Sequence, residues 1–347
     1  MNDEQKAELI QWYQSNRRAN DGLADLVRGI LSSLLSLRGI DFLSVSARVK
    51  DIDSVVSKAE RKNYEKPTAE ITDIVGVRVI TYIEADVAKV EAEIKKAFRV
   101  HANMSLDKGA ELGVDKIGYR SVHFVCDIGE KRSELPECSI FSNTLFEIQV
   151  RSILQHAWAE IEHDRGYKFS GTLPKHLSRK LNLVAGSLEL ADSEFNSIAA
   201  DLDKYSAEVA KATIQGNYHF ALDSTTVDAL LERIRNRLKK CRVNKSTLSA
   251  QEIGEINEFG IKDLSQLESL FTDQFLEAAD EHYRVRGSMG IIRAAMMWHD
   301  IERYFGQVWK KKFDALSVKT YQLVVSRWGE TLVDKCLKNH GVLLDSG

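Results

Sequence analysis

The sequence predicts an α+β protein, in which a mixed β-sheet flanked by helices is followed by an all-helical C-terminal domain. Two observations support this. Runs rich in Ile, Val and Thr begin at residue 71 and recur up to residue 151, and such runs are typical of buried strands. Helical patterns lie between these runs, and strands that alternate with helices indicate an α/β sheet. From Pro174 onward no convincing strand is found before the last residues, so this part is predicted to be helical.

Three parts are expected along the 347 residues. Residues 1–45 would form N-terminal helices, residues 46–215 the sheet domain, and residues 216–347 the helical C-terminal domain. A chain of this length suggests two domains, or one domain with a large extension. The linker between them is placed at Gly216 to Thr226.

Composition excludes several classes of protein. The chain carries 48 basic and 51 acidic residues, so it does not bind polyanions through its net charge, although a local patch could. Its four cysteines show no C-x2-C spacing, which argues against a metal site built on them. The charged N-terminus lacks the apolar run of a signal peptide, and no segment reaches the roughly 18 apolar residues of a membrane helix. We therefore expect a cytoplasmic protein with no membrane partner.

The elements of the sheet domain follow from hydrophobic periodicity. The apolar residues of segment 4–40 recur at steps of three and four, which predicts two helices. A further helix is expected at residues 46–62, before a break at Pro67. The remaining order is a strand at residues 71–83, a helix at 84–98, strands at 120–128 and 145–151, and a helix at 152–168.

Acidic residues interrupt two of these strands. Asp73 lies in the first and Glu147 in the third, and a charge within a buried strand is costly unless it is paired or bound to a metal. Two carboxylates from neighbouring strands suit Mg2+, which uses a few carboxylates together with substrate phosphates. Buried ion pairs, Asp73 with Arg78 and Glu147 with Arg151, explain the same residues equally well. Because side chains alternate along a strand, Glu147, Gln149 and Arg151 share one face.

Basic residues gather in the segment before Pro67. Arg48, Lys50, Ser54 and Lys58 lie on the predicted helix 46–62, and the ten positions from Arg48 to Lys58 are close to three turns. These side chains could therefore share one face, which would suit a triphosphate. A solvated surface is the alternative, because Lys and Arg usually lie on surfaces.

A glycine precedes an aromatic residue at the mouth of the second strand. Tyr119 could offer its ring to a nucleobase, and Lys116 could meet phosphates. The alternative is a loop tyrosine that packs on its own domain. Further on, His156 and His163 are seven positions apart. Two metal ligands on one helix favour a spacing of four, so zinc is not expected.

Taken together, these stretches resemble the synthetase domain of the RelA/SpoT family, especially the small alarmone synthetases. They occur in the family's order, and the resemblance covers roughly residues 20–200. In one departure, Ser152 follows the third-strand arginine where the family often has Thr. The matching motifs are Arg48–Lys58 (R-x-K-x3-S-x3-K), Asp73–Arg78 (DIVGVR), Gly118–His123 (GYRSVH), Glu147–Arg151 (EIQVR) and Trp158–His163 (WAEIEH).

The resemblance implies a nucleotidyltransferase-like sheet and a GTP diphosphokinase. Such an enzyme transfers the β,γ-pyrophosphate of ATP to the 3′-hydroxyl of GDP or GTP, with Mg2+ as cofactor, and makes (p)ppGpp. Asp73 and Glu147 would be the catalytic and metal-binding residues. The resemblance assigns ATP to Arg48, Lys50, Ser54, Lys58 and Arg78, the acceptor to Lys116, Tyr119, His123, Gln149 and Arg151, and supporting roles to Glu162 and His163.

Two other functions stay open at this point. A toxin-like relative would pyrophosphorylate the 3′ end of tRNA, and the basic run from Arg233 to Lys245 could track a phosphate backbone. A solvated helix face also explains that run. A non-catalytic nucleotide-sensing module is disfavoured because Asp73 and Glu147 are both present. The C-terminal domain, residues 216–347, is outside the resemblance. We expect it to regulate the synthetase, either by covering the acceptor site or by building a homo-oligomer.

Overall fold

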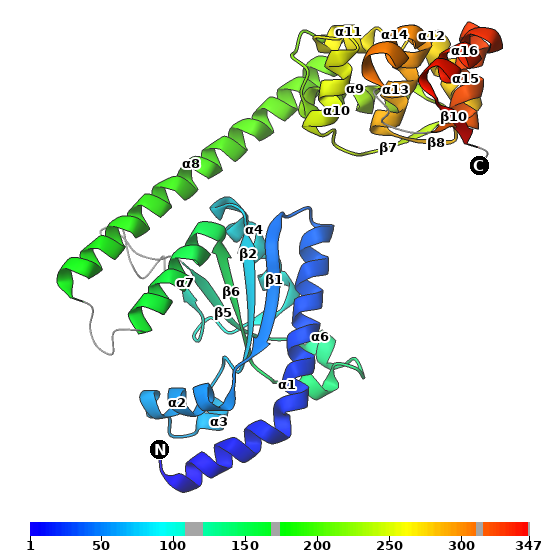
Figure 1. Ribbon diagram of the computed structural model, residues 1–347. Coiled ribbons are helices and arrows are strands. Elements are labelled where there is room, and N and C mark those ends of the chain that lie inside the picture. Colours follow the sequence, from blue (N-terminus) through cyan, green and yellow to red (C-terminus); the bar gives the residue numbers. More distant parts are fainter. Residues whose placement is uncertain (108–120, 168–173, 310–314, 346–347) are drawn as a thin grey trace. The chain divides into compact units, whose positions relative to one another are not determined.

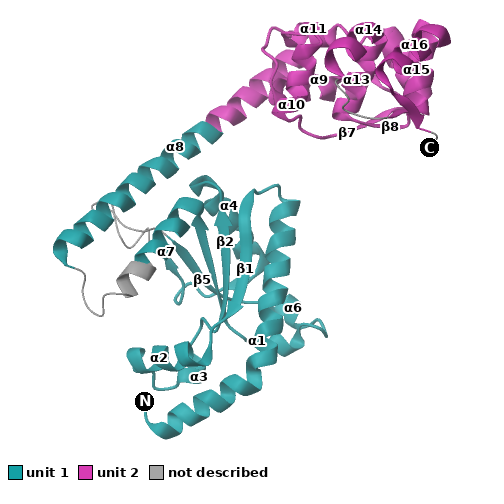
Figure 2. Cartoon of the chain, in the orientation of Figure 1, with its two compact units in different colours: residues 1–199 teal, residues 200–347 magenta. Residues whose placement is uncertain are grey.

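The computed structural model describes residues 1–107, 121–167, 174–309 and 315–345 (Figure 1). Contacts divide the chain into two compact units, residues 1–199 and 200–347 (Figure 2). The division falls inside the helix α8 (Lys175–Ile214), which contributes residues to both units. None of the helices in the described ranges is both long and apolar enough to cross a membrane.

The first unit is built on a mixed β-sheet. In the part of the chain that the structure describes, six strands pair in the order β1-β2-β6-β5-β3, and β4 also pairs with β5. The central pair β2 and β6 is parallel, and the other pairs are antiparallel. This arrangement confirms the predicted mixed sheet. The strands are β1 (Phe42–Val49), β2 (Val75–Thr81), β3 (Arg99–Val100), β4 (Leu106–Asp107), β5 (Val122–Asp127) and β6 (Phe146–Ser152).

One face of this sheet is apolar and buried. The long helix α1 (Asp3–Leu37) and the helix α4 (Glu84–Ala97) supply apolar side chains that pack against it. Burying one such Val or Leu side chain contributes about 1.5–3 kcal/mol, so this face stabilises the unit. Because side chains alternate along a strand, the opposite face is left for polar residues. The apolar face includes Val75, Val77, Val79, Phe146, Ile148 and Val150, which pack with Leu23, Val27, Leu31, Val87, Val90 and Ile94.

The N-terminal segment differs from the prediction in two ways. Residues 4–40 do not form two helices, because α1 runs without a break to Leu37. Residues 46–49 are not helical either, because they complete β1. The next helix, α2 (Ile52–Lys62), begins only after Asp51, whose side chain accepts a hydrogen bond from the Ser54 N–H at 2.8 Å. This cap fixes the helix start and explains why the strand can extend up to Val49.

The prediction that four polar residues share one helical face is therefore wrong. Arg48 lies on β1 and Lys50 follows that strand, whereas Ser54 and Lys58 lie on α2. Asp73 also differs from its predicted place, because it precedes β2 and is not inside the strand. Among its described residues, this unit also contains α3 (Pro67–Glu70), α6 (Glu130–Ser133) and α7 (Ile153–Tyr167).

The second unit is mostly helical, as predicted, but it also contains short strands. Two parallel pairs occur in the described residues, β7 (Arg242–Asn244) with β8 (Val285–Gly287) and β9 (Ala315–Ser317) with β10 (Leu343–Asp345). Strands of three residues are too short for an alternating pattern to be recognised in a sequence. The helices are α9 (Ser224–Arg237), α10 (Ala250–Glu258), α11 (Leu264–Glu268), α12 (Asp273–His282), α13 (Ser288–His299), α14 (Ile301–Arg303), α15 (Val318–Trp328) and α16 (Glu330–His340).

The aromatic and methionine-rich stretch of the second unit is part of its core. Met296, Tyr304 and Phe305 are at most 2% exposed, and Trp298 and Trp309 are at most 9% exposed. These side chains pack into one large cluster with residues from α9 to α16. The stretch therefore serves the folding of this unit and is not an exposed interface.

Candidate active site

The polar face of the sheet brings cations and carboxylates into register. Arg48 on β1 pairs with Gly76 on β2, and Gly76 pairs with Glu147 on β6. Residues that pair across a sheet lie on the same face. The side chains of Arg48 and Glu147 therefore extend from the same face, with a glycine between them.

A second polar row lies beside the first. Arg78 on β2 pairs with Ser46 on β1 and with Gln149 on β6, and Gln149 pairs in turn with His123 on β5. This row adds a cation, an amide and an imidazole to the face that carries Glu147. Four strands thus contribute to one polar surface.

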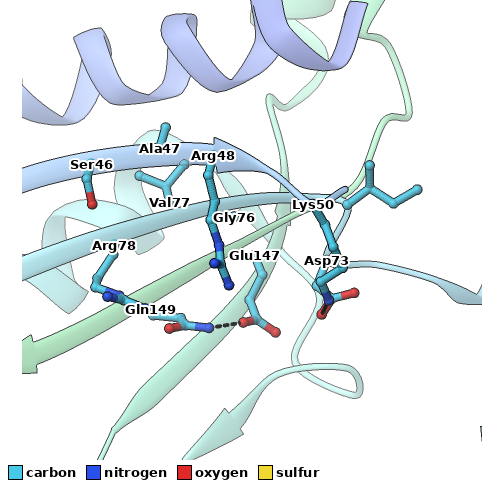
Figure 3. Close-up of a pocket in the computed structure, with 11 residues that line it drawn as sticks. Ser46, Ala47, Arg48, Lys50, Asp73, Gly76, Val77, Arg78, Glu147 and Gln149 are labelled. Atoms are coloured by element: carbon cyan, nitrogen blue, oxygen red, sulfur yellow. Dashed lines mark hydrogen bonds and ion pairs between the residues drawn. The ribbon is translucent and has the colours of Figure 1, made fainter. Parts of the chain in front are cut away.

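All members of these two rows except His123 line a pocket of about 210 Å3. Figure 3 shows the arrangement, in which Glu147 lies between Gln149 and Asp73. Asp73 comes from the segment just before β2. It lines the same pocket as Glu147, so the pocket contains two carboxylates. Its lining comprises Ser46, Ala47, Arg48, Lys50, Asp73, Ile74, Gly76, Val77, Arg78, Glu147 and Gln149.

Asp73 is held between two lysines. Its Oδ2 lies 2.5 Å from the Nζ of Lys50 and 2.8 Å from the Nζ of Lys58. Burial acts to raise the pKa of Asp73, but the hydrogen bonds and charges of the two lysines outweigh it and hold the pKa below its ordinary value. The backbone of Lys50 is fixed as well, because its N–H donates to Ile74 and its carbonyl accepts from Tyr13.

Glu147 is held by groups from two strands. Its Oε1 accepts a hydrogen bond of 2.5 Å from the amide of Gln149 and lies 3.3 Å from Nδ1 of His123. Burial and the nearby charge of Asp73 act to raise the pKa of Glu147, but His123 and Gln149 outweigh them and keep it below its ordinary value. Glu147 is therefore ionised at neutral pH.

The amide of Gln149 links Glu147 to a buried arginine. Its Oε1 accepts from the guanidinium of Arg151 at 3.1 Å, while its Nε2 donates to Glu147. Arg151 is only 7% exposed. Because its oxygen accepts from the arginine, the amide presents its NH2 group to Glu147.

The helix α7 holds Arg78 through Glu160. The guanidinium of Arg78 lies 2.9 Å from Oε1 of Glu160, and Nδ1 of His156, also on α7, lies 3.6 Å from the same oxygen. Burial and the charge of Arg78 lower the pKa of His156, which favours the neutral imidazole at physiological pH. Arg78 thus lines the pocket while it is held by a helix outside the sheet.

The carboxylates of Asp73 and Glu147 fit a divalent cation whose remaining ligands would come from a substrate. Asp73 leaves its Oδ1 buried without a hydrogen-bond partner, although its Oδ2 is paired. Within the described residues, no group of three or more His, Cys, Asp or Glu side chains could enclose a metal ion. Mg2+ does not need such a cage, since it is usually held by one or two carboxylates together with substrate phosphates and water.

The structure does not bring every predicted residue into the pocket. Ser54 is exposed, and its Oγ donates to the carboxylate of Asp51 at 2.9 Å, so it takes part in the cap of α2. Glu162 is exposed on α7 and does not line the pocket. Lys116 and Tyr119 lie outside the described residues, as does the side chain of His163.

Gly76 and Glu160 are among the site residues that were not predicted from the sequence. Gly76 lines the pocket between Arg48 and Glu147, and a glycine inside a strand signals a close approach of another group. That signal was present in the sequence. Glu160 was not recognisable in advance, because nothing in the sequence indicates which strand residue α7 will contact.

Carboxylates and cations that line one pocket define a protein that binds phosphorylated ligands, with the charges placed for phosphoryl chemistry. Comparisons with known proteins agree with this class. Residues 47–172 match the family described as a region found in RelA / SpoT proteins. This range contains every residue that lines the pocket except Ser46.

Two curated proteins of Bacillus subtilis (strain 168) are similar to this chain. GTP pyrophosphokinase YjbM is 29% identical over 171 residues, which cover 48% of this chain and 76% of that protein. GTP pyrophosphokinase YwaC is 30% identical over 163 residues, which cover 45% of this chain and 73% of that protein. The chain therefore belongs to the RelA/SpoT family.

Two solved structures are also similar to part of this chain. The crystal structure of small alarmone synthetase 1 from Bacillus subtilis is 25% identical, with a TM-score of 0.47, and covers 56% of this chain and 99% of that one. A GTP pyrophosphokinase family protein from Streptococcus pneumoniae is 25% identical, with a TM-score of 0.46, and covers 57% of this chain and 96% of that one.

Proposed function

We propose that this protein is a GTP diphosphokinase, which transfers the β,γ-pyrophosphate of ATP to the 3′-hydroxyl of GDP or GTP and so makes (p)ppGpp. The observation that carries the proposal is the shared pocket of Asp73 and Glu147, with Arg48, Lys50 and Arg78 in its lining. The two relatives from Bacillus subtilis are both named GTP pyrophosphokinases, which favours a guanosine nucleotide over the 3′ end of tRNA as the acceptor.

The cations of the pocket would bind the triphosphate of ATP. Arg48 and Arg78 extend from neighbouring strands, and Lys50 and Lys58 meet at Asp73. Transfer of this kind depends on positioning and charge neutralisation more than on covalent catalysis. Asp73 and Glu147 would hold Mg2+, which when bound neutralises charge that develops on the phosphate oxygens.

Glu147 would accept the proton of the attacking hydroxyl. Its pKa is held below the ordinary value, so the carboxylate is present at neutral pH. The 3′-oxygen forms a bond to the β-phosphorus of ATP, the bond from that phosphorus to the α,β-bridging oxygen breaks, and AMP leaves. Gln149 orients the carboxylate through its 2.5 Å hydrogen bond to Oε1.

The acceptor would bind beside Glu147. His123 and Gln149 both contact that carboxylate, and Arg151 contacts Gln149. A ribose hydroxyl that approaches Glu147 would therefore meet these residues. The family resemblance adds Tyr119 as the ring that stacks on guanine and Lys116 as a phosphate ligand.

We also propose that the enzyme acts in the cytoplasm, while a homo-oligomer remains a prediction of the sequence.

The test is a transfer assay with three acceptors. The purified protein is incubated with Mg2+ and with ATP labelled in its β-phosphate. Each of three parallel reactions also contains one acceptor, which is GDP, GTP or deacylated tRNA. Label is expected on the guanosine nucleotides. Label on tRNA alone would assign the protein to the toxin-like class, and no label on any acceptor would contradict the proposal.

A matched pair of variants connects the activity with the pocket. Glu147→Gln keeps the shape of the side chain but removes the charge, so turnover should fall at least about a thousandfold. Glu137→Gln removes an exposed carboxylate outside the pocket lining and should leave turnover unchanged. Thermal unfolding should show that both variants are folded at the assay temperature. Turnover retained by Glu147→Gln would refute the role of this residue.

A further inference from the structure

The helix α8 contacts the sheet domain where its two central strands end. The strands β2 and β6 end at Thr81 and Ser152, which are paired with each other and buried. The helix α4 follows the first of these strands, and α7 follows the second. From α8, Asn196 accepts a hydrogen bond of 2.9 Å from the N–H of Ala85 on α4, and Asp192 contacts Ser152. Asp192 and Asn196 are one turn apart, so a single face of α8 meets both junctions.

Asp192 is a buried carboxylate that the proposed reaction does not use. Its Oδ2 accepts a hydrogen bond of 2.6 Å from the hydroxyl of Ser152, and only 2% of Asp192 is exposed. Burial raises the pKa of Asp192 above its ordinary value, and the charge of Glu84 adds to this effect, while the hydrogen bond from Ser152 opposes it. A buried carboxylate whose charge is opposed in this way is a candidate for a functional role.

Ser152 caps the start of α7. Its Oγ accepts a hydrogen bond of 3.2 Å from the N–H of Gln155, and Oε1 of Gln155 accepts one of 3.0 Å from the N–H of Ser152. These reciprocal hydrogen bonds form a capping box. A hydroxyl has one proton to donate, and here Asp192 accepts it. The oxygen of Ser152 therefore keeps its lone pairs for the helix, so Asp192 fixes the cap on which α7 begins.

The junction of β6 and α7 lies between two sets of pocket groups. The strand β6 carries Glu147 and Gln149, which line the pocket. The helix α7 carries Glu160, whose Oε1 lies 2.9 Å from the guanidinium of Arg78. Glu160 comes about two turns after the start of the helix. A change in the direction of α7 at its cap would therefore displace the carboxylate that holds Arg78.

We propose that Asp192 is a positioning residue for the ATP site, which acts through Ser152 and α7 on the placement of Arg78. This inference rests on the proposed function, because it takes the ligand of the pocket to be ATP. Asp192 lies outside residues 47–172, which match the family. The inference therefore gives the helix α8 a part in nucleotide binding that the family match does not include.

The test is a calorimetric titration of the protein with Mg2+-ATP. S152A removes the donor and D192A the acceptor, so each should weaken ATP binding about two- to fivefold, the range expected for loss of the partly exposed pair of Arg78 and Glu160. D192N keeps an oxygen that can accept from the hydroxyl, so its affinity should stay within about twofold of the parent. S187A is the control and should leave the affinity unchanged, because Ser187 is exposed on α8 and its hydroxyl donates to the carbonyl of Leu183 in the same helix.

A double variant shows whether the effect passes through α7. S152A/E160Q should bind Mg2+-ATP as weakly as E160Q alone, because without the charge of Glu160 the position of α7 no longer affects Arg78. Independent effects would instead multiply, to about four- to twenty-fivefold. A residue that only stabilised the fold would not produce the first result.

Three outcomes would overturn the inference. Unchanged affinity in S152A would mean that the cap does not matter to the pocket. Multiplied losses in the double variant would show that Ser152 does not act through Glu160. Equal losses in D192N and D192A would show that acceptance of the hydrogen bond is not the role of Asp192.

Two further measurements separate this inference from other failures. Unfolding curves should show that every variant is folded at the temperature of the titration, which separates a displaced Arg78 from a lost fold. The titration contains no acceptor nucleotide, so it decides the role of Asp192 whatever the transfer assay shows. A parent that does not bind Mg2+-ATP would refute the proposed function as well.

Discussion

Arg48 on β1 and Glu147 on β6 are both in register with Gly76, which separates them on the polar face of the sheet. A Cβ atom added at Gly76 would meet no other heavy atom within 4 Å. The space above this glycine is therefore open, and it belongs to the pocket that contains both carboxylates. A side chain at this position would enter the pocket without touching the apolar core.

Gly76→Val should therefore weaken ATP binding and preserve the fold. Valine is favoured in strands, so the temperature of unfolding should stay the same or rise, while affinity for Mg2+-ATP falls at least tenfold. Calorimetric titration and thermal unfolding measure the two effects. Gly287→Val is the matched control, because Gly287 is a strand glycine of the second unit with equally open surroundings. Unchanged ATP affinity in Gly76→Val would mean that the nucleotide does not use this pocket.

Asp73→Asn should lower both activity and stability. The variant leaves Lys50 and Lys58 without the carboxylate that each contacts within 2.8 Å, which should lower the free energy of unfolding by roughly 1–3 kcal/mol at pH 7. Denaturant titration of parent and variant measures this difference.

The same pair of proteins tests the pKa of Asp73. Because the folded pKa lies below the ordinary value of about 3.9, the stabilisation is complete above that value and is lost as the pH falls through the lower, folded pKa. The difference in stability should be constant from pH 5 to 7 and should shrink below about pH 4. A difference that grew on acidification would show that the lysines do not stabilise the ionised form.

Glu160→Gln should weaken ATP binding more than it slows turnover. The variant removes the charge that holds Arg78 at 2.9 Å, and Glu160 is 55% exposed, so the pair contributes at most about 1 kcal/mol. The KM for ATP should rise about two- to fivefold, with kcat nearly unchanged. Steady-state kinetics separate the two constants, and Glu137→Gln again serves as the control. A fall in kcat at constant KM would indicate a role other than the placement of Arg78.

The central sheet could be predicted because its strands have strong local signals. The strands that carry Val77 and Ile148 are apolar, β-branched and bounded by turns. The strand β1 was missed because its one charged residue, Arg48, lies ten positions before Lys58, and that spacing is also the spacing of one helix face. What ended that strand was the cap of Asp51 on Ser54, a local contact that outweighs the wider pattern.

The candidate site was predicted better than the elements that carry it. Six of the predicted residues line the pocket. They were identified from the order of the family's motifs along the sequence, and that order can be recognised without a correct assignment of helices and strands. The pairing of Asp73 with Lys50 and Lys58 was not predicted, since the sequence suggested Arg78 as its partner. The contact with Lys58 depends on how α2 packs against α1 and the segment before β2, which periodicity cannot report.

The alternation along β2 and β6 has a consequence for how such proteins can change. Val75, Val77 and Val79 are buried and maintain the fold, although Val77 also touches the pocket, whereas Gly76 and Arg78 between them line the pocket from the polar face. A mutation at Gly76 or Arg78 can therefore alter ligand preference at little cost in stability, and one at Val75 or Val79 does the reverse. Selection for a new nucleotide and selection for a durable scaffold can thus proceed on separate sets of residues within a single short strand.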